Sequence, residues 1–415
     1  MHRSRIAFSG MLAMLLATPT LAQAIWIVDD DGGAGMHFTD IPPAITAASP
    51  GDVLRVFPGS YSTFVLDKAL VIVAQPGGTA LVNGLAKIAG IGGGTSIAVV
   101  AGLTPNAWKV TNCYLPVLLD ACTGTSPPYG GWDPFGLEVT NCTDLRVQRS
   151  SFKGGSYPTP YGDGGDGVRI ANGRVQLSDC IAIGPHGGHA STNSQPYGGH
   201  GGSGIENVQS TFSHVHAYRC QLKGGNGGKS YGSTGYPGNG GHGLHSGGVV
   251  LAGLAEHQIV SGVAGTSPYG YGWDGYAILA TLSLRSSGVT TQGPISLPNQ
   301  IQSPLPPDPS LQLITSFPAA GQSLALRVDG PPGAQVELVF GRKPILVDQP
   351  GLQEDVLVLE TRRVIAGPIP SNGTLDWTIG ISPALPHGTV FLVQAELLYP
   401  AGDLRRTNSV TVVLR

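Results

Sequence analysis

Aromatic residues recur in five Gly-rich segments between residues 125 and 275, and their types suit the binding of sugars. Four segments contain Pro-Tyr-Gly, and SPPYGGWD (126–133) and SPYGYGWD (267–274) are near duplicates. An exposed ring stacks on the apolar face of a pyranose, while Asp, Asn and His side chains bind its hydroxyl groups. We expect carbohydrate contacts from Tyr129, Trp132, Tyr161, Tyr197, Tyr269 and Trp273. The alternative is that the rings of successive segments pack on one another, with glycine permitting tight turns.

The same segments carry carboxylates and imidazoles. Asp163 and Asp166, in Asp-Gly-Gly-Asp, are the candidates for a Ca²⁺ site, and a solvated turn is the alternative. Clustered histidines can bind a transition metal or act as acid or base, although single loop histidines usually do neither. The histidines in question are His186, His189, His200, His242 and His245.

A ten-residue pattern positions these segments. It alternates apolar and polar residues, then has a small residue or Cys, and ends in Gly. The copies are LPVLLDACTG from Leu115, LRVQRSSFKG from Leu145, VQLSDCIAIG from Val175 and VHAYRCQLKG from Val215, with a divergent copy, LSLRSSGVTT, from Leu282. Such repeats stack because one unit cannot bury its apolar face alone. The pattern predicts a solenoid with apolar positions inside, with Arg146, Gln148, Gln176 and Ser178 outside, and with the Gly-rich segments leaving from one corner.

All five cysteines lie in the repeat region, and their spacing matches no zinc site. Cys180 and Cys220 share a repeat position, and Cys113 and Cys142 share the context Thr-Asn-Cys. Stacked strands bring such pairs within disulfide range, so each pair is expected to form either a disulfide or a stack of buried thiols. Cys122 is left without an equivalent.

The ends of the chain indicate export and a second domain. Residues 1–24 have a basic start, a short apolar stretch and an Ala-x-Ala site, which predict a signal peptide and a secreted or surface-attached product. Residues 25–293 are expected to form the solenoid with a helix near Ile41–Ala48 in its cap. Residues 294–309 read as a Pro-rich linker, and 310–415 as a β-sandwich that attaches to the cell surface or to a partner.

Charge excludes some partners. The formal net charge is −3, more negative without Arg3 and Arg5, and no basic stripe is present, so nucleic acid is not an expected partner. No segment after the leader is apolar enough to predict a transmembrane helix.

The stretch AITAASPGDVLRVFPGSYSTFVLDKALVIVAQPG resembles the opening of secreted right-handed parallel β-helix proteins of the pectin-lyase-like group. The matching positions are Ala47, Ala48, Pro50, Gly51, Asp52, Val53, Pro58, Gly59, Tyr61, Lys68, Leu70, Ile72 and Gly77. This resemblance implies an all-β fold and export, but no particular activity. The repeat region lacks the adjacent Asp pair and the Asn-Thr-Asp of the hydrolases. A lyase needs a basic residue that faces clustered acidic residues, and Arg146, Arg149 and Arg169 have no such cluster opposite them in the sequence pattern.

Three functions follow as hypotheses. The first is an extracellular polysaccharide-binding protein that uses the loops. The second is a polysaccharide lyase or glycoside hydrolase that uses loop Asp and His residues, with or without Ca²⁺. The third is a structural surface or adhesin protein whose loops only pack.

Overall fold

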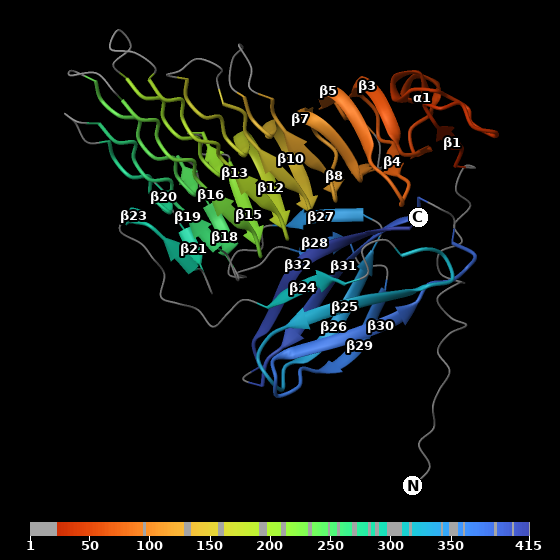
Figure 1. The fold of residues 1–415 in the computed structure, drawn as a ribbon. Coiled ribbons are helices and arrows are strands. Elements are labelled where there is room, and N and C mark those ends of the chain that lie inside the picture. The colour runs from red at the N-terminus through yellow and green to blue at the C-terminus, as the bar shows by residue number, and fades with distance from the viewer. Residues whose placement is uncertain are drawn as a thin grey trace. The chain divides into compact units, whose positions relative to one another are not determined.

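The structure is a computed structural model in which residues 23–93, 97–127, 134–156, 162–190, 197–208, 213–230, 235–247, 250–254, 258–267, 272–280, 284–286, 290–296, 309–314, 318–341, 343–347, 356–359, 362–385, 388–400 and 402–414 are described. Apart from the helix α1 (Ile41–Ala47), all helices and strands assigned in these residues are strands (Figure 1). Contacts divide the chain into two compact units, one spanning residues 26–308 and one containing residues 309–415. Most of the expected linker, 294–309, lies outside the described residues, as does the expected leader.

Long parallel sheets make up the first unit. The main sheet runs in the order β1 (Ile25–Val28), β2 (Val53–Val56), β4 (Val71–Ala74), β6 (Ala98–Ala101), β8 (Val117–Asp120), β10 (Leu137–Gln148), β12 (Val168–Ser178), β14 (Ile205–Asn207), β17 (Leu244–Ser246), β20 (Ile278–Ala280) and β23 (Ile295–Ser296). Joined to it are β3 (Gly59–Leu66), β5 (Ala80–Ala89), β7 (Leu103–Cys113) and β15 (His214–Tyr218). A second sheet runs β22 (Thr290–Gln292), β19 (Gln258–Val260), β16 (Gln221–Lys223), β13 (Ile181–Ile183), β11 (Ser151–Lys153) and β9 (Thr123–Thr125). In addition, β18 (Val250–Leu254) pairs with β21 (Leu284–Ser286).

Parallel register stacks equivalent residues, and we call such a stack a column. One interior column is fully buried and consists of Trp108, Leu137, Val168, Ile205, Leu244 and Ile278. Burying each of these large apolar side chains contributes about 1.5–3 kcal/mol. The alternating apolar residues of the repeat are buried as predicted, for example Leu145 and Val147.

The polar residues between them, predicted to point out of the solenoid, lie outside the apolar core but are not exposed. Arg146, Gln148, Gln176 and Ser178 are all buried rather than exposed. Alternation separates the two faces of a strand, but it does not reveal whether the second face is covered. Polar partners make this burial tolerable, since Asp144 accepts hydrogen bonds from Arg146 at 3.1 Å.

Two sets of residues with left-handed backbone conformation (positive φ) bend the chain between strands. Asn112, Asn141 and Asn172 have φ of 53°, 55° and 59° and form a ladder in which each side-chain amide donates to the Asn before it, at 3.1 and 2.7 Å. Asn tolerates this conformation better than other residues with a side chain. At the other bend, Arg149 (φ 50°) forms a bidentate ion pair with the fully buried Asp120.

The strand register corrects the repeat alignment. Leu145 pairs with Val117, so the first copy begins at Val117 and not at Leu115. A shift of two residues leaves the apolar face unchanged, and for that reason the pattern alone could not detect it. In this register Cys122 occupies the same repeat position as Cys180 and Cys220, so it is not the exception that we expected. The strand pairing after Val215 shows two further repeats before residue 292, because β16 pairs with β19 and β19 pairs with β22.

The expected helix at the start of the first unit is present as α1. Asp40 caps it by accepting the N–H of Ile41 at 2.8 Å, and Pro42 and Pro43 stand in its first turn. Ile41 and Ile45 join the apolar core of the unit. The described residues contain no helix long and apolar enough to cross a membrane.

Antiparallel sheets make up the second unit. One runs β24 (Ser310–Leu313), β25 (Ser323–Asp329), β30 (Thr374–Gly380), and another runs β29 (Arg362–Pro368), β26 (Gln335–Gly341), β31 (Val390–Leu398), β32 (Leu404–Val413). A third sheet pairs β27 (Lys343–Val347) with β28 (Val356–Leu359). Apolar residues from the first two sheets, among them Leu326 and Val393, share one core.

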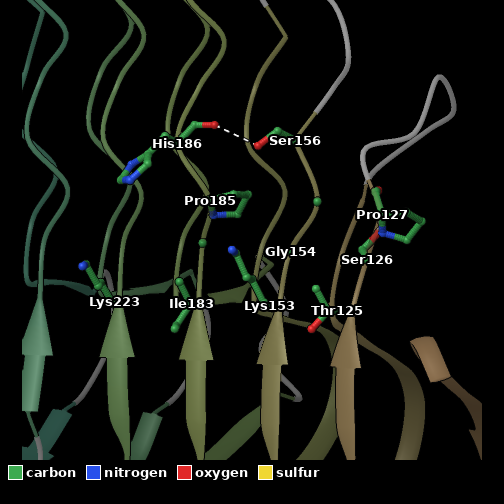
Figure 2. A pocket seen from close by; sticks show the side chains of 12 residues that line it. Thr125, Ser126, Pro127, Lys153, Gly154, Ser156, Ile183, Pro185, His186 and Lys223 are labelled. Carbon is green, nitrogen blue, oxygen red and sulfur yellow. Dashed lines mark hydrogen bonds between the residues drawn. The ribbon is translucent and has the colours of Figure 1, made fainter. Parts of the chain in front are cut away.

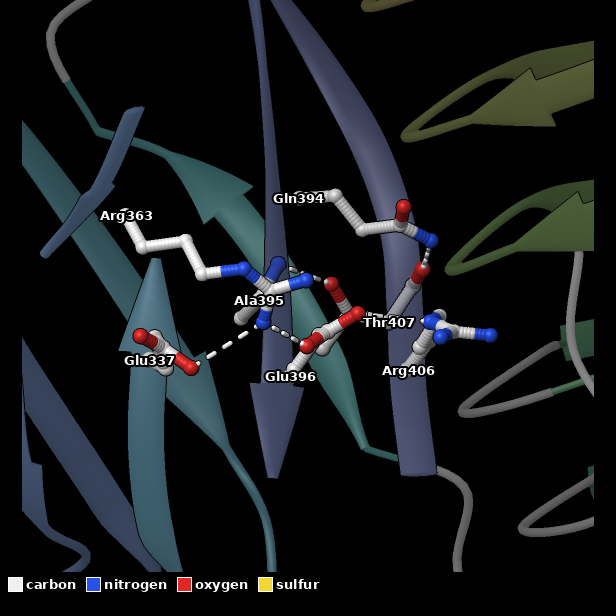
Figure 3. A network of polar contacts seen from close by, with 7 residues as sticks. All are labelled: Glu337, Arg363, Gln394, Ala395, Glu396, Arg406 and Thr407. Atoms are coloured by element: carbon white, nitrogen blue, oxygen red, sulfur yellow. Dashed lines mark hydrogen bonds and ion pairs between the residues drawn. The ribbon is translucent and has the colours of Figure 1, made fainter. Parts of the chain in front are cut away.

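A polar network ties strands of the second unit together (Figure 3). Glu396 on β31 is almost fully buried and accepts hydrogen bonds from Arg406 at 2.7 Å and from Arg363. Burial raises the pKa of Glu396, but the two guanidinium groups outweigh it and the net pKa is lowered. This carboxylate therefore stays ionised.

Candidate functional site

The Gly-rich segments are ordered limbs that run in two layers. Outgoing limbs, which include 184–190, 224–230 and 262–266, follow the strands of the second sheet. Return limbs, which include 162–167, 197–204, 235–243 and 272–277, lead back to the main sheet. The described glycines between 124 and 275 have no positive φ, so they do not serve the tight turns that we considered. The alternative of tight turns stays a prediction for Gly130, Gly131, Gly232 and Gly270, which lie outside the described residues.

Hydrogen bonding in the limbs repeats every three residues. In Gly201-Gly202, the first N–H donates within the layer to Asn239 (2.9 Å) and the second donates across the layers to Pro185 (3.0 Å). Gly227-Gly228 follow the same rule, donating to Val263 and Gly199. An extended backbone with three residues per turn and all its hydrogen bonds external is a polyproline II helix. The limbs therefore form a two-layer bundle of such helices.

Close packing of the two layers excludes side chains at the glycines. A methyl group on Gly201 would collide with the carbonyl of Gly225, and one on Gly228 would collide with that of Gly188. Most side chains that the limbs expose stand on the third residue of a triplet, as those of Lys229 and Trp273 do; the exposed Asp274 is at another position, and Ser203 is a buried third residue. The sequence signal was the Gly-Gly-x triplet of GGHGGS and GGNGGKS, whose period of three we did not read.

Third residues of the return limbs form three adjacent columns, which we call the return face. The first column is Tyr197 and Tyr236, the second is Asp163, His200, Asn239 and Trp273, and the third is Asp166, Ser203, His242 and Tyr276. In the second column each side chain accepts the backbone N–H of the next member, at 2.6 to 2.9 Å. Three residues of polyproline II span about 9 Å, and neighbouring strands lie about 4.8 Å apart. The return face is thus a regular grid of side chains.

Aromatic groups stand on this grid with their surfaces open. Trp273 is 79% exposed, and Tyr197 and Tyr236 are 58% and 62% exposed. The two Tyr rings are nearly parallel, with centroids 6.3 Å apart, and Tyr276 stacks on His242 at 5.7 Å. Tyr197 and Trp273 are the two expected sugar contacts that the structure describes. Tyr129, Trp132, Tyr161 and Tyr269 lie outside the described residues.

Beside the third column, outward residues of β14 and β17 form an acid–base group. Glu206 pairs in register with His245, and its carboxylate lies 2.8 Å from the Nδ1 atom of that ring. The hydrogen bond with Glu206 raises the pKa of His245, whereas burial and the neighbouring His245 lower the pKa of His242. The two rings are 5.0 Å apart. Neighbouring groups whose pKa values are pushed apart suit the roles of acid and base.

The other loop histidines have a structural role. Nδ1 of His186, His189 and His200 accepts the backbone N–H of Asn226, Lys229 and Asn239, respectively. This assigns the proton of each neutral ring to Nε2. The histidines are spread along both layers, so they are not one metal-binding cluster.

Asp163 and Asp166 are three residues apart on one limb, and each accepts a backbone N–H from the next limb, from His200 and Ser203. Within the described residues, the acidic group dense enough to hold a metal ion is Asp29, Asp30 and Asp31 at the start of the chain. Asp133, in the segment 126–133, lies outside the described residues. The Ca²⁺ assignment stays a prediction.

The five cysteines are free and buried. Cys113 and Cys142 pair in register between β7 and β10. Burial raises the pKa of Cys122 to about 12 and also raises that of Cys180. In this structure the cysteines are buried free thiols. The hydrogen bond with Cys142 lowers the pKa of Cys113 to about 7, so low reactivity is expected for the protonated thiols of Cys122 and Cys180.

No family model, curated protein or solved structure matches the chain. The case for a function therefore depends on the return face itself.

Proposed function

We propose that the chain is an exported protein whose return face binds polysaccharide. The observation that carries the proposal is the row of aromatic side chains on adjacent columns, with Trp273 most exposed. The backbone beneath them is held by hydrogen bonds from the first two N–H groups of each triplet, so the rings are presented on a rigid surface and little entropy is lost on binding. Asn239, His200 and Asp163 stand in the same column as Trp273 and supply polar groups for sugar hydroxyls.

We propose further that the first unit is a right-handed parallel β-helix of the pectin-lyase-like type. The parallel columns, the asparagine ladder at the bends and the capping helix support this proposal, together with the resemblance of residues 44–77. The second unit is then a β-sandwich that attaches the protein to a cell surface or partner. Its shared core and its antiparallel sheets support this assignment.

A panel of polysaccharides in native affinity gels tests the binding proposal. The wild-type protein is expected to be retarded by at least one neutral or acidic polysaccharide, and Trp273→Ala should lose most of that retardation. Retardation that persists unchanged in Trp273→Ala would show that the polysaccharide binds elsewhere on the molecule and would contradict the proposal. Absence of retardation across the panel would leave the third hypothesis, loops that only pack, which the Tyr197–Tyr236 stack already illustrates.

A second candidate is catalysis on a bound polysaccharide, with Glu206, His242 and His245 as an acid–base group. The separated pKa directions of the two imidazoles favour it. The assay is incubation with acidic and neutral polysaccharides, following unsaturated products for a lyase and reducing ends for a hydrolase. Activity must be lost in His245→Ala and in His242→Ala; activity that survives both substitutions contradicts this candidate.

A further inference from the structure

A cavity of about 560 Å³ lies at the base of the outgoing limbs (Figure 2). It opens where β9, β11, β13 and β16 end, at Thr125, Lys153, Ile183 and Lys223. Its residues come from outgoing limbs and strand ends, so it is separate from the return face. The hydroxyl of Ser156 donates to the carbonyl of His186 at 3.0 Å across one side of the cavity.

The cavity is cationic. Lys153 and Lys223 belong to one column with Ile183 between them, which places their Cα atoms about 10 Å apart. Lysine stems are long enough for both ammonium groups to reach one anion at the centre of this span. The lining contains no Asp or Glu, and neither lysine has an acidic partner in the part of the chain that the structure describes.

His186 adds a donor to the same space. Its Nδ1 accepts the N–H of Asn226 at 2.7 Å, so Nε2 carries the proton of the neutral ring. Burial, together with the charges of Lys223 and Lys153, lowers the pKa of His186. A bound anion would reverse the effect of the lysines on this imidazole.

Apolar surface completes the lining. Ile183 lies between the two lysines, and Pro127 and Pro185 line the cavity as well. A bare inorganic ion gains nothing from apolar contacts, whereas a sugar ring has an apolar face that packs on such side chains. The volume also falls within the range of sites that enclose small organic ligands.

We propose that this cavity binds an anionic sugar, meaning a monosaccharide unit that carries a phosphate, sulfate or carboxylate group. Lys153, Lys223 and the Nε2–H of His186 bind the anionic group, and Ile183, Pro127 and Pro185 contact the ring. The ligand is either a free monosaccharide or one unit of an anionic polysaccharide chain. This site does not depend on sugar binding at the return face, because the two share no residue.

Titration of the full chain with glucose 6-phosphate, glucuronate, a short oligomer of uronate units, glucose and inorganic phosphate tests the proposal, using calorimetry and the NMR signals of His186. Saturable binding of at least one anionic sugar is expected, with a rise in the pKa of His186. Glucose and inorganic phosphate should bind at least tenfold more weakly. A preference for the oligomer over the monomers identifies the polysaccharide as the source of the ligand, and the reverse identifies the free sugar.

Variants separate this site from other surfaces. Lys153→Ala and Lys223→Ala should each weaken binding at least tenfold. Lys153→Gln should weaken it equally, because it removes the charge while keeping most of the side chain. Lys229→Ala is the matched control, because Lys229 lies two triplets after Lys223 on the same limb and does not line the cavity. This variant should bind as the wild type does. Absence of saturable binding by every anionic sugar overturns the proposal, as does equal affinity of the Lys153, Lys223 and Lys229 variants. Trp273→Ala leaves this binding unchanged even if it abolishes polysaccharide retardation.

Discussion

At the scale of single residues, the informative groups are those whose partners set their charge. Glu206 and His245 lie on adjacent strands with His242 on the return limb beside them, yet burial and hydrogen bonding act on the two imidazoles in opposite directions. The other loop histidines are held as backbone acceptors. His242 likewise accepts a backbone N–H, from Tyr276, so only its position beside Glu206 and His245 distinguishes it from the other three.

The two rings should titrate separately. We expect NMR titration to give His245 a pKa above the ordinary value of about 6.5 and His242 a pKa below it. Glu206→Gln removes the hydrogen-bonded charge, so the pKa of His245 should fall. Its raised pKa contributes stability at low pH that is lost as pH rises through the folded-state value, whereas the lowered pKa of His242 destabilises the fold as pH falls below about 6.5. Identical titration curves for the two rings would contradict the geometry.

The state of the cysteines can be tested by counting the thiols that a reagent labels. All five thiols are buried, and burial keeps Cys122 and Cys180 protonated at neutral pH. Without reductant, a thiol reagent should label none of the five in the native protein within minutes and all five after denaturation. Labelling of only three or one after denaturation would demonstrate one or two disulfides in place of the stacked thiols.

At the scale of elements, glycine spacing decides the structure of the limbs. The Gly201→Ala methyl group would collide with a backbone carbonyl that cannot move without breaking the bundle. Overpacking of this kind costs about 1–3 kcal/mol. We expect Gly201→Ala to lower the melting temperature and to speed amide exchange in the limbs. Gly92→Ala is the control, because a methyl group there makes only ordinary contacts and meets no positive φ. Equal stability of the two variants would argue against the two-layer bundle.

Glu396 makes a similar test possible in the second unit. Glu396→Gln removes a buried carboxylate that accepts from Arg363 and Arg406. Because hydrogen bonds to charged groups contribute about 1.5–3 kcal/mol, the variant should lose about 2 kcal/mol at pH 7. The lowered pKa means that this stability is present above the unfolded-state value of about 4.3 and is lost as pH falls through the folded-state value. Urea unfolding of both proteins at pH 7 and pH 3 checks this; a difference that is undiminished at pH 3 contradicts the assignment.

The strand pattern was predictable, whereas the loop structure was not. Alternating apolar residues predict the strands and inward columns, and Pro42 with Pro50-Gly51 predict the ends of α1. A two-residue shift between Leu115 and Val117 leaves the alternation intact, so only observed pairing resolves it. The limbs were missed because polyproline II has no apolar period; its signal is the spacing of glycine. The Glu206–His245 pair joins residues thirty-nine positions apart and needed the register of β14 on β17.

At the scale of the whole molecule, the first unit combines a buried apolar rod with a glycine bundle that carries two faces of different character. The return face is aromatic and polar, and the base of the outgoing limbs is cationic. The stack of strands sets the spacing of both, since each outgoing limb begins at a strand of the second sheet and each return limb leads to a strand of the main sheet. Function is therefore expected on the limbs rather than in the core.

The dissociation constant of the best-retarded polysaccharide, measured by affinity electrophoresis, tests the central claim most directly. The comparison is between the wild type, Trp273→Ala on the return face and Lys229→Ala on the outgoing limb 224–230. We predict that Trp273→Ala weakens binding at least tenfold, about 1.4 kcal/mol, while Lys229→Ala binds as the wild type does. Equal affinity of the two variants, or no affinity of the wild type for any polysaccharide, would contradict a sugar-binding return face.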